Sequence, residues 1–86
     1  MSGKSRDELR QVVLDALAKV VPELDASTLD SEQPLREQLD IDSMDFLNFV
    51  VAIHAALGVD VPERDYAKLG TLRSCVDYLS AIQQGA

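Results

Sequence analysis

The most informative part of the chain is LDIDSMD at residues 39–45, together with the apolar run Phe46–Leu57 that follows it at once. This pattern predicts an acidic loop that becomes a hydrophobic helix at Asp42 or Ser43 and ends at Leu57. Asp42 is the expected N-cap, and Asp45 adds a favourable negative charge to the first turn. Ser43 would then present a primary hydroxyl at a helix N-terminus, which is a favourable place to hold a phosphate ester.

Three further helices are predicted, two of them long and one short. Ser5 and Glu8 have the spacing of a capping box and open a helix that stops near Pro22. A short helix is expected at Glu63–Lys68, and Thr71 is a suitable N-cap for the last helix. The apolar residues at helical spacing are Leu9, Val12, Val13, Ala16, Leu17 and Val20 in the first helix, and Leu72, Cys75, Val76, Leu79 and Ile82 in the last.

These elements predict an all-α fold, a four-helix bundle of three main helices and one short helix, in a single domain over residues 1–86. A chain of 86 residues is enough for one small domain. Because only 5% of the residues are aromatic, the core must be built mainly from Leu, Val, Ile and Ala. The segment Asp25–Glu37 is predicted as a long polar loop. The leucines expected to pin it to the core are Leu24, Leu29, Leu35 and Leu39.

The charge of the chain is unevenly distributed. The net charge is −7, but residues 23–65 alone hold eleven acidic and two basic residues, a local net charge of −9. This acidity disfavours nucleic acid as a partner and favours a protein with a basic patch, although solubility alone could also explain it. No apolar run reaches the roughly 20 residues of a membrane span, and the polar N-terminus does not resemble a signal peptide. We therefore expect a cytoplasmic monomer that does not insert into membranes.

The helix after Asp42 carries two apolar stripes. Phe46, Phe49, Val50, Ile53 and Leu57 form an ordinary core stripe. Met44, Leu47 and Val51 form a second stripe, centred roughly 120° away around the helix. The second stripe is either a docking surface for a partner or the contact face of a helix buried on two sides, and periodicity alone leaves both open. Met44 favours docking slightly, because its flexible thioether suits adaptable interfaces.

No constellation typical of catalysis or of metal binding is present. His54 lies roughly 16 Å from Ser43 by helical rise, which excludes a Ser–His nucleophile within this helix. An EF-hand that starts at Asp40 would need a glycine in place of Asp45 and a glutamate in place of Val51. One cysteine and one histidine exclude an ordinary zinc site. His54 is expected at the surface and Cys75 in the core, and no catalytic residue is assigned. Position alone leaves capping as the commoner role for a serine at a helix start.

Four segments, in order along the chain, resemble acyl carrier proteins. Asp42-Ser43-Met44-Asp45 resembles the Asp-Ser-Leu-[Asp/Glu] signature of that family. Leu35–Leu39 is similar to the family's approach to the serine, Leu57–Pro62 to its aromatic-Gly-Ile-x-Ile-Pro connection, and Thr71–Leu79 to its last helix.

The resemblance implies a stand-alone carrier that is not itself an enzyme. Ser43, with Asp42 beside it, would bear a covalent 4′-phosphopantetheine from coenzyme A, added by a magnesium-dependent phosphopantetheinyl transferase. The thiol of this arm would hold an acyl or aminoacyl group as a thioester for fatty acid, lipid, polyketide or related biosynthesis. Loading ligases and transferases with basic patches would dock on Met44, Asp45, Leu47 and Val51. The alternative is an acidic helical interaction module that carries nothing.

Three departures from the family pattern indicate a specialised member rather than the housekeeping fatty acid carrier. Asp40 stands where the family usually has glycine. Fatty-acid-synthesis carriers have glutamates after the serine, where this chain has Asn48, His54, Ala55 and Ala56. Phe46 replaces a small residue, often threonine, and would fill the interior. We therefore expect a cargo that is short, polar or aminoacyl, and Asp-Ser-Met also resembles carriers of activated D-alanine.

Overall fold

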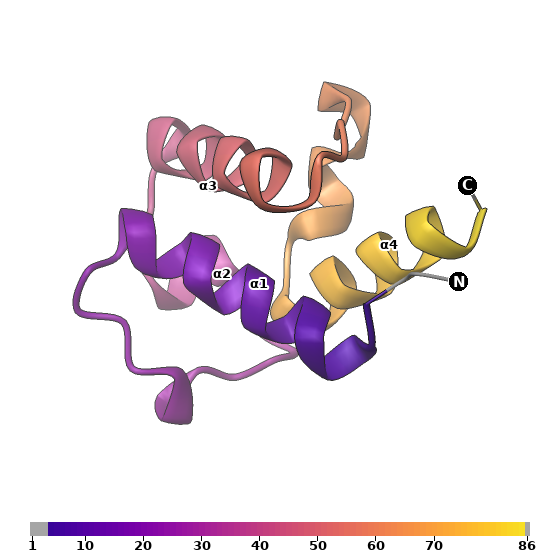
Figure 1. The fold of residues 1–86 in the computed structure, drawn as a ribbon. Helices are drawn as coiled ribbons and strands as arrows, with labels where there is room; N and C mark the ends of the chain where they lie inside the picture. The colour runs from indigo at the N-terminus through magenta and orange to yellow at the C-terminus, as the bar shows by residue number, and fades with distance from the viewer. Residues whose placement is uncertain (1–3, 86) are drawn as a thin grey trace.

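The computed structural model describes residues 4–85, whose regular structure is entirely helical (Figure 1). In chain order the elements are α1 (Arg6–Val20), η1 (Ala26–Thr28), α2 (Leu35–Gln38), α3 (Ser43–Leu57), η2 (Glu63–Leu69) and α4 (Leu72–Gly85), where η marks a 3₁₀ helix. The all-α prediction of three long helices and one short helix is confirmed, and η1 and α2 are two small additions to it.

The predicted helix caps are confirmed. Ser5 and Glu8 form the capping box of α1, in which each side chain accepts a hydrogen bond from the backbone N–H of the other residue. Thr71 and Ser74 do the same at the start of α4, at 3.0 Å in both directions. Gly58 ends α3 with a φ of 71°, a left-handed conformation that glycine adopts without steric cost. Capping is a local interaction, and for this reason the sequence could predict it.

The segment Asp25–Glu37, predicted as a loop, contains η1 and the beginning of α2. These helices are too short to show a hydrophobic period, so they could not be predicted from the sequence. The predicted anchors do pack on the core: Leu35 is fully buried, and Leu24, Leu29 and Leu39 are partly buried. The backbone N–H of Leu35 also donates to the carbonyl of Gly70 at 2.8 Å, which fixes α2 against the end of η2.

The core lies where α1 packs against both α3 and α4, and η2 covers it from the side of α4. The largest fully buried side chains are Phe49, Leu9, Leu17, Leu35, Ile53, Leu69, Leu72, Leu79, Val13 and Cys75. In α1, Leu14 is buried whereas Val12, which was predicted in the stripe, is only half-buried. Two neighbouring helices cover α1, so its buried arc is wider than a single stripe.

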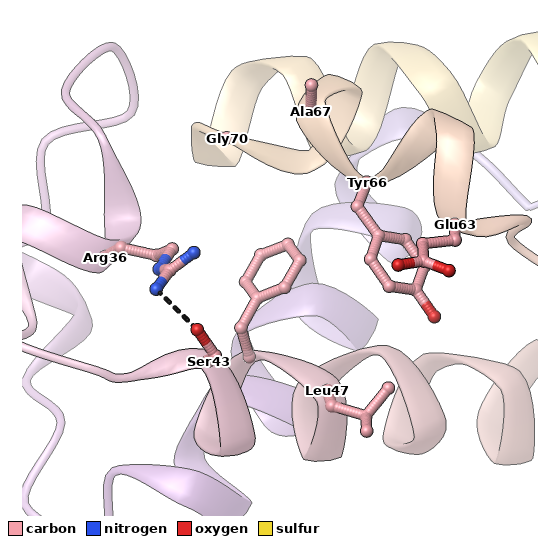
Figure 2. A pocket seen from close by; sticks show the side chains of 8 residues that line it. Arg36, Ser43, Leu47, Glu63, Tyr66, Ala67 and Gly70 are labelled. Carbon is pink, nitrogen blue, oxygen red and sulfur yellow. Dashed lines mark hydrogen bonds between the residues drawn. The ribbon is translucent and has the colours of Figure 1, made fainter.

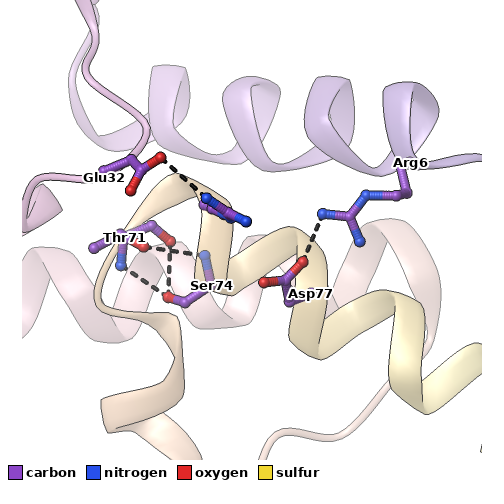
Figure 3. A network of polar contacts seen from close by, with 6 residues as sticks. Arg6, Glu32, Thr71, Ser74 and Asp77 are labelled. Carbon is purple, nitrogen blue, oxygen red and sulfur yellow. Dashed lines mark hydrogen bonds and ion pairs between the residues drawn. The ribbon is translucent and has the colours of Figure 1, made fainter.

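Polar contacts join the two ends of the chain. Arg6 of α1 pairs with Asp77 of α4 (Figure 3). A separate ion pair, Arg73–Glu32, ties the start of α4 to the loop before α2. The backbone of Lys4 exchanges two hydrogen bonds of 3.1 Å with the side chain of Gln83. α1 and α4 are therefore antiparallel, and α3 begins at the end of the molecule opposite the termini (Figure 1). The beginning of α3 thus lies away from the contact between Lys4 and Gln83.

Candidate functional site

Ser43 is the first residue of α3, and its side chain is exposed. Asp42 precedes it in extended conformation and caps the helix, because its Oδ1 accepts the backbone N–H of Asp45 at 2.8 Å. The Asp42 carbonyl begins the helical ladder by accepting the N–H of Phe46 at 2.9 Å. The capping role that position alone allowed for Ser43 therefore belongs to Asp42, and the serine hydroxyl is not needed to end the helix.

The Ser43 hydroxyl accepts a hydrogen bond from Arg36, whose Nη2 lies 3.2 Å from Ser43 Oγ (Figure 2). The same guanidinium lies 5.8 Å from the centroid of the Phe46 ring, within the range of a cation–π contact. Arg36 belongs to α2, which the burial of Leu35 fixes in place. Sequence reasoning did not assign Arg36 to the site; its only signal there was a basic residue in a strongly acidic segment.

A cavity of about 570 Å³ opens beside Ser43, between α2, α3 and η2 (Figure 2). The rings of Phe46 and Tyr66 meet edge to face in its wall, with centroids 5.9 Å apart. Arg36 and Glu63 bring opposite charges to it. The lining residues are Arg36, Ser43, Phe46, Leu47, Glu63, Tyr66, Ala67 and Gly70. A group attached to Ser43 thus has an aromatic, partly polar hollow next to it.

The second apolar stripe of α3 is exposed. Met44, Leu47 and Val51 keep 66%, 43% and 57% of their surface, while Phe46, Phe49, Val50 and Ile53 face the core. The other helices therefore do not cover this stripe, which was the question that periodicity left open. Three large apolar side chains in a row beside Ser43 are typical of a contact surface.

His54 and Cys75, the other residues considered as possible functional groups, lie away from Ser43. His54 is exposed near the end of α3, with Nδ1 3.0 Å from the carbonyl of Val59 and 3.1 Å from Asp60. Cys75 is fully buried, as predicted, and burial raises the pKa of its thiol to about 12. Within residues 4–85 no three His, Cys, Asp or Glu side chains lie close enough together to hold a metal ion. Over the same residues no helix is long and apolar enough to span a bilayer.

The residues around Ser43 fit a phosphodiester. Its Oγ is accessible, the first turn of α3 offers unpaired N–H groups, and Arg36 supplies a guanidinium at hydrogen-bond distance. The carboxylates of Asp40, Asp42 and Asp45 oppose a further negative charge in the same region. An exposed site of this kind can accept and hold a phosphate ester.

Known proteins resemble this chain in sequence and in fold. The family described as the phosphopantetheine attachment site matches residues 8–79. The acyl carrier protein of Micrococcus luteus is 30% identical over 77 residues, which cover 86% of this chain and 95% of that protein. The one from Myxococcus xanthus is also 30% identical, over 81% of this chain and 92% of that protein. A solved acyl carrier protein from Enterococcus faecalis, at 22% identity, superposes with a TM-score of 0.75 over 91% of this chain and 98% of that chain.

Proposed function

This chain belongs to the acyl carrier protein family and holds acyl groups on a covalent 4′-phosphopantetheine, and we propose that Ser43 is the residue that bears this group. The observation that carries the proposal is the exposed Ser43 hydroxyl at the start of α3, which Asp42 leaves free by capping the helix itself. Ser43 also lies within the matched segment, inside the Asp-Ser-Met-Asp motif.

The attachment step is a phosphoryl transfer in which Ser43 is the nucleophile. Its Oγ forms a bond to the pantetheine-side phosphorus of coenzyme A, and the bond from that phosphorus to the bridging oxygen of the pyrophosphate breaks. Adenosine 3′,5′-bisphosphate leaves, and the hydroxyl proton passes to a base of the transferase. The bound group supplies a thiol that holds the cargo as a thioester. Ser43 only anchors the arm, and partner enzymes perform the chemistry on the cargo.

Intact-mass measurement tests the assignment of Ser43. The protein is incubated with coenzyme A, magnesium and a broad-specificity phosphopantetheinyl transferase. We expect a mass gain of one phosphopantetheine group, lost in Ser43→Ala and kept in Ser27→Ala, which removes another exposed hydroxyl. If the wild-type protein gains no mass under conditions that modify a known carrier, the assignment is wrong. The alternative function, an interaction module that carries nothing, would then be favoured.

The cargo that fits this chain best is short, polar or aminoacyl. Phe46, only 8% exposed, fills the space between Phe49 and Tyr66, at centroid distances of 5.8 and 5.9 Å. Phe49 behind it is fully buried. A long acyl chain that entered the core would have to displace these rings, and forcing extra volume into a packed interior costs about 1–3 kcal/mol. The charges of Arg36 and Glu63 at the cavity suit a polar group better than a hydrocarbon.

NMR of the octanoyl-loaded protein tests this cargo class. Because the wild-type core is filled, the methyl resonances of Ile53, Leu69 and Leu79 should keep their positions when octanoyl replaces acetyl on the arm. In Phe46→Leu, which opens space and keeps an apolar side chain, the same replacement should shift them. Core methyl shifts in the wild-type protein would show that the bundle does enclose a long chain.

The partners proposed for this carrier are a phosphopantetheinyl transferase and loading or acyl-transfer enzymes with basic surfaces. Met44, Leu47 and Val51 offer an exposed apolar contact beside the attachment serine, and Asp45 adds charge at its edge. A small apolar contact with electrostatic steering gives fast and weak association, which a carrier needs in order to leave each enzyme. The lack of the family's glutamates at Asn48, His54, Ala55 and Ala56 supports a specialised set of partners.

A further inference from the structure

Arg36 is held beside the attachment serine by three kinds of contact. The buried Leu35 and its hydrogen bond to Gly70 fix the backbone of α2. The Arg36 carbonyl accepts the N–H of Ile41 at 3.2 Å, which ties α2 to the loop before α3. The guanidinium lies over the Phe46 ring and donates to Ser43 Oγ. A long side chain that is exposed in solvent is thus directed to one place.

Among the residues that the structure describes, the guanidinium of Arg36 pairs with no carboxylate, although its segment is the most acidic of the chain. Within residues 4–85 no Asp or Glu lies at ion-pair distance from it. Arg6 and Arg73, by contrast, pair with Asp77 and Glu32. Arg36 instead donates to a neutral hydroxyl, which leaves its positive charge uncompensated at short range.

We propose that Arg36 is the counter-ion and positioning residue for the phosphodiester of the arm, an inference that rests on the proposed attachment at Ser43. The phosphorus is bonded directly to Oγ, so its two free oxygens lie only two bonds beyond the Oγ atom that Arg36 already reaches. Arginine binds phosphate oxygens by charge-assisted, often bidentate hydrogen bonds, which are stronger than a bond to a hydroxyl. The pair also offsets the repulsion from Asp40, Asp42 and Asp45.

A consequence concerns the start of the arm. The same guanidinium lines the cavity between α3 and η2, so a phosphodiester held by Arg36 directs the following atoms toward the walls formed by Phe46 and Tyr66. An exposed ion pair is weak and is screened by salt. The arm is therefore biased toward the cavity and remains free to swing out when a partner enzyme engages it.

Phosphorus NMR of the modified protein tests this inference. Wild type, Arg36→Gln, Arg36→Lys and Arg64→Gln are each converted with coenzyme A and transferase and checked by intact mass. The urea-unfolded modified protein gives the ³¹P resonance of an unconstrained phosphodiester. We expect Arg36→Gln to move the folded resonance toward that reference. Arg36→Lys, which keeps a point charge without the planar fork, should lie between. Arg64→Gln removes an equal charge from another exposed arginine and should leave the resonance unchanged.

The outcomes separate this inference from the attachment itself. Modified wild-type and Arg36→Gln proteins with the same ³¹P resonance would overturn the role of Arg36 and leave Ser43 as the attachment residue. Failure of wild type to gain mass would overturn both. If circular dichroism shows that Arg36→Gln is unfolded, or if this variant is not modified, the ¹⁵N resonances of the Arg36 guanidinium in wild type test the inference instead. They should shift on modification and return toward their unmodified positions in high salt, and unchanged resonances would contradict the inference.

Discussion

At the scale of single residues, the site divides its tasks among neighbours. Asp42 caps α3, Ser43 presents the hydroxyl, and Arg36 approaches from α2. Asp40 has a φ of 54°, in the left-handed region that the glycine usual at this place in the family adopts freely. Aspartate is among the few other residues that tolerate this region, so the departure from glycine preserves the local backbone. Aspartate at position 40 is therefore compatible with the turn that precedes Ser43.

Cys75 gives a prediction at the same scale. Its thiol is fully buried and burial raises its pKa to about 12, so at neutral pH it is neither ionised nor accessible. We expect the folded, unmodified protein to react with no thiol reagent at neutral pH, and the phosphopantetheine-modified protein to react at one thiol per chain. A colorimetric thiol assay measures both.

The control for this assay is the urea-unfolded, unmodified protein, in which the single cysteine of the chain should react. Labelling of the folded, unmodified protein at a rate close to that of the unfolded one would contradict the burial of Cys75.

At the scale of elements, η2 is attached to α4 by a pair of side chains. The hydroxyl of Tyr78 donates to Asp65 Oδ2 at 2.7 Å, and Lys68 lies 3.5 Å from the other oxygen of this carboxylate. The hydrogen bond from Tyr78 lowers the pKa of Asp65 below its ordinary 3.8. Burial, together with the nearby Asp65, raises the pKa of Tyr78 to about 12. The pair is positioned to keep η2, and with it one wall of the cavity, against the bundle.

The lowered pKa of Asp65 predicts how stability depends on pH. A carboxyl whose pKa is lower in the folded state contributes stability that is fully present above the unfolded pKa and lost as pH falls through the folded pKa. Tyr78→Phe removes the main cause of the shift. When the pH is lowered from above 3.8 to below it, the free energy of unfolding should therefore decrease less in Tyr78→Phe than in wild type. Urea titrations at the two pH values measure this difference.

A matched control is Tyr66→Phe, which removes the hydroxyl of the other tyrosine in the chain, a hydroxyl without a hydrogen-bond partner in the described structure. It should leave the acid dependence as in wild type. Equal acid dependence in wild type and Tyr78→Phe would show that the Asp65 contact does not contribute in solution.

At the scale of the whole molecule, the charge and the apolar stripe occupy the same region. The acidic segment, residues 23–65, includes both the loop that leads to Ser43 and the exposed stripe of Met44, Leu47 and Val51. Basic partners would be drawn to this region by long-range attraction, and the stripe would then provide the short-range contact. The ends of the chain, tied together at the far side, are not needed for this approach.

Steering predicts that single charges change the rate of modification. Asp45→Asn should lower kcat/KM for the transferase by about 2- to 10-fold at low salt and reduce its dependence on salt. Asp15→Asn changes the net charge equally on the exposed face of α1 and should have a smaller effect. Kinetics at several salt concentrations measure both variants. Equal effects of the two, or rates that do not depend on salt, would count against steering.

The apolar part of the same surface can be separated from the charges. Val51→Ser keeps the net charge and removes an exposed apolar side chain from the stripe. It should raise KM for the transferase while the salt dependence stays as in wild type, since only the short-range contact is weakened. An unchanged KM would show that Val51 lies outside the docking surface.

Features that depend on neighbours along the chain could be predicted from the amino-acid sequence alone. The caps at Ser5, Asp42 and Thr71, the left-handed end of α3 at Gly58 and the motif around Ser43 all follow from interactions within a few residues. Each is decided by local hydrogen bonds or backbone preferences, which are legible without the fold. The acidity of the middle segment is likewise a property of composition.

The exposed face of α3 and the side chains beside Ser43 depend on tertiary packing and could not be predicted from the sequence. The helical period placed Met44, Leu47 and Val51 on one stripe, but their exposure depends on where α1, η2 and α4 pack. Arg36 reaches Ser43 because α2 forms and is pinned by Leu35 and Gly70, residues far apart in the chain. The cavity exists only where α2, α3 and η2 meet. Contacts between distant segments are set by the packing of the whole core, and that packing has no local signature in the sequence.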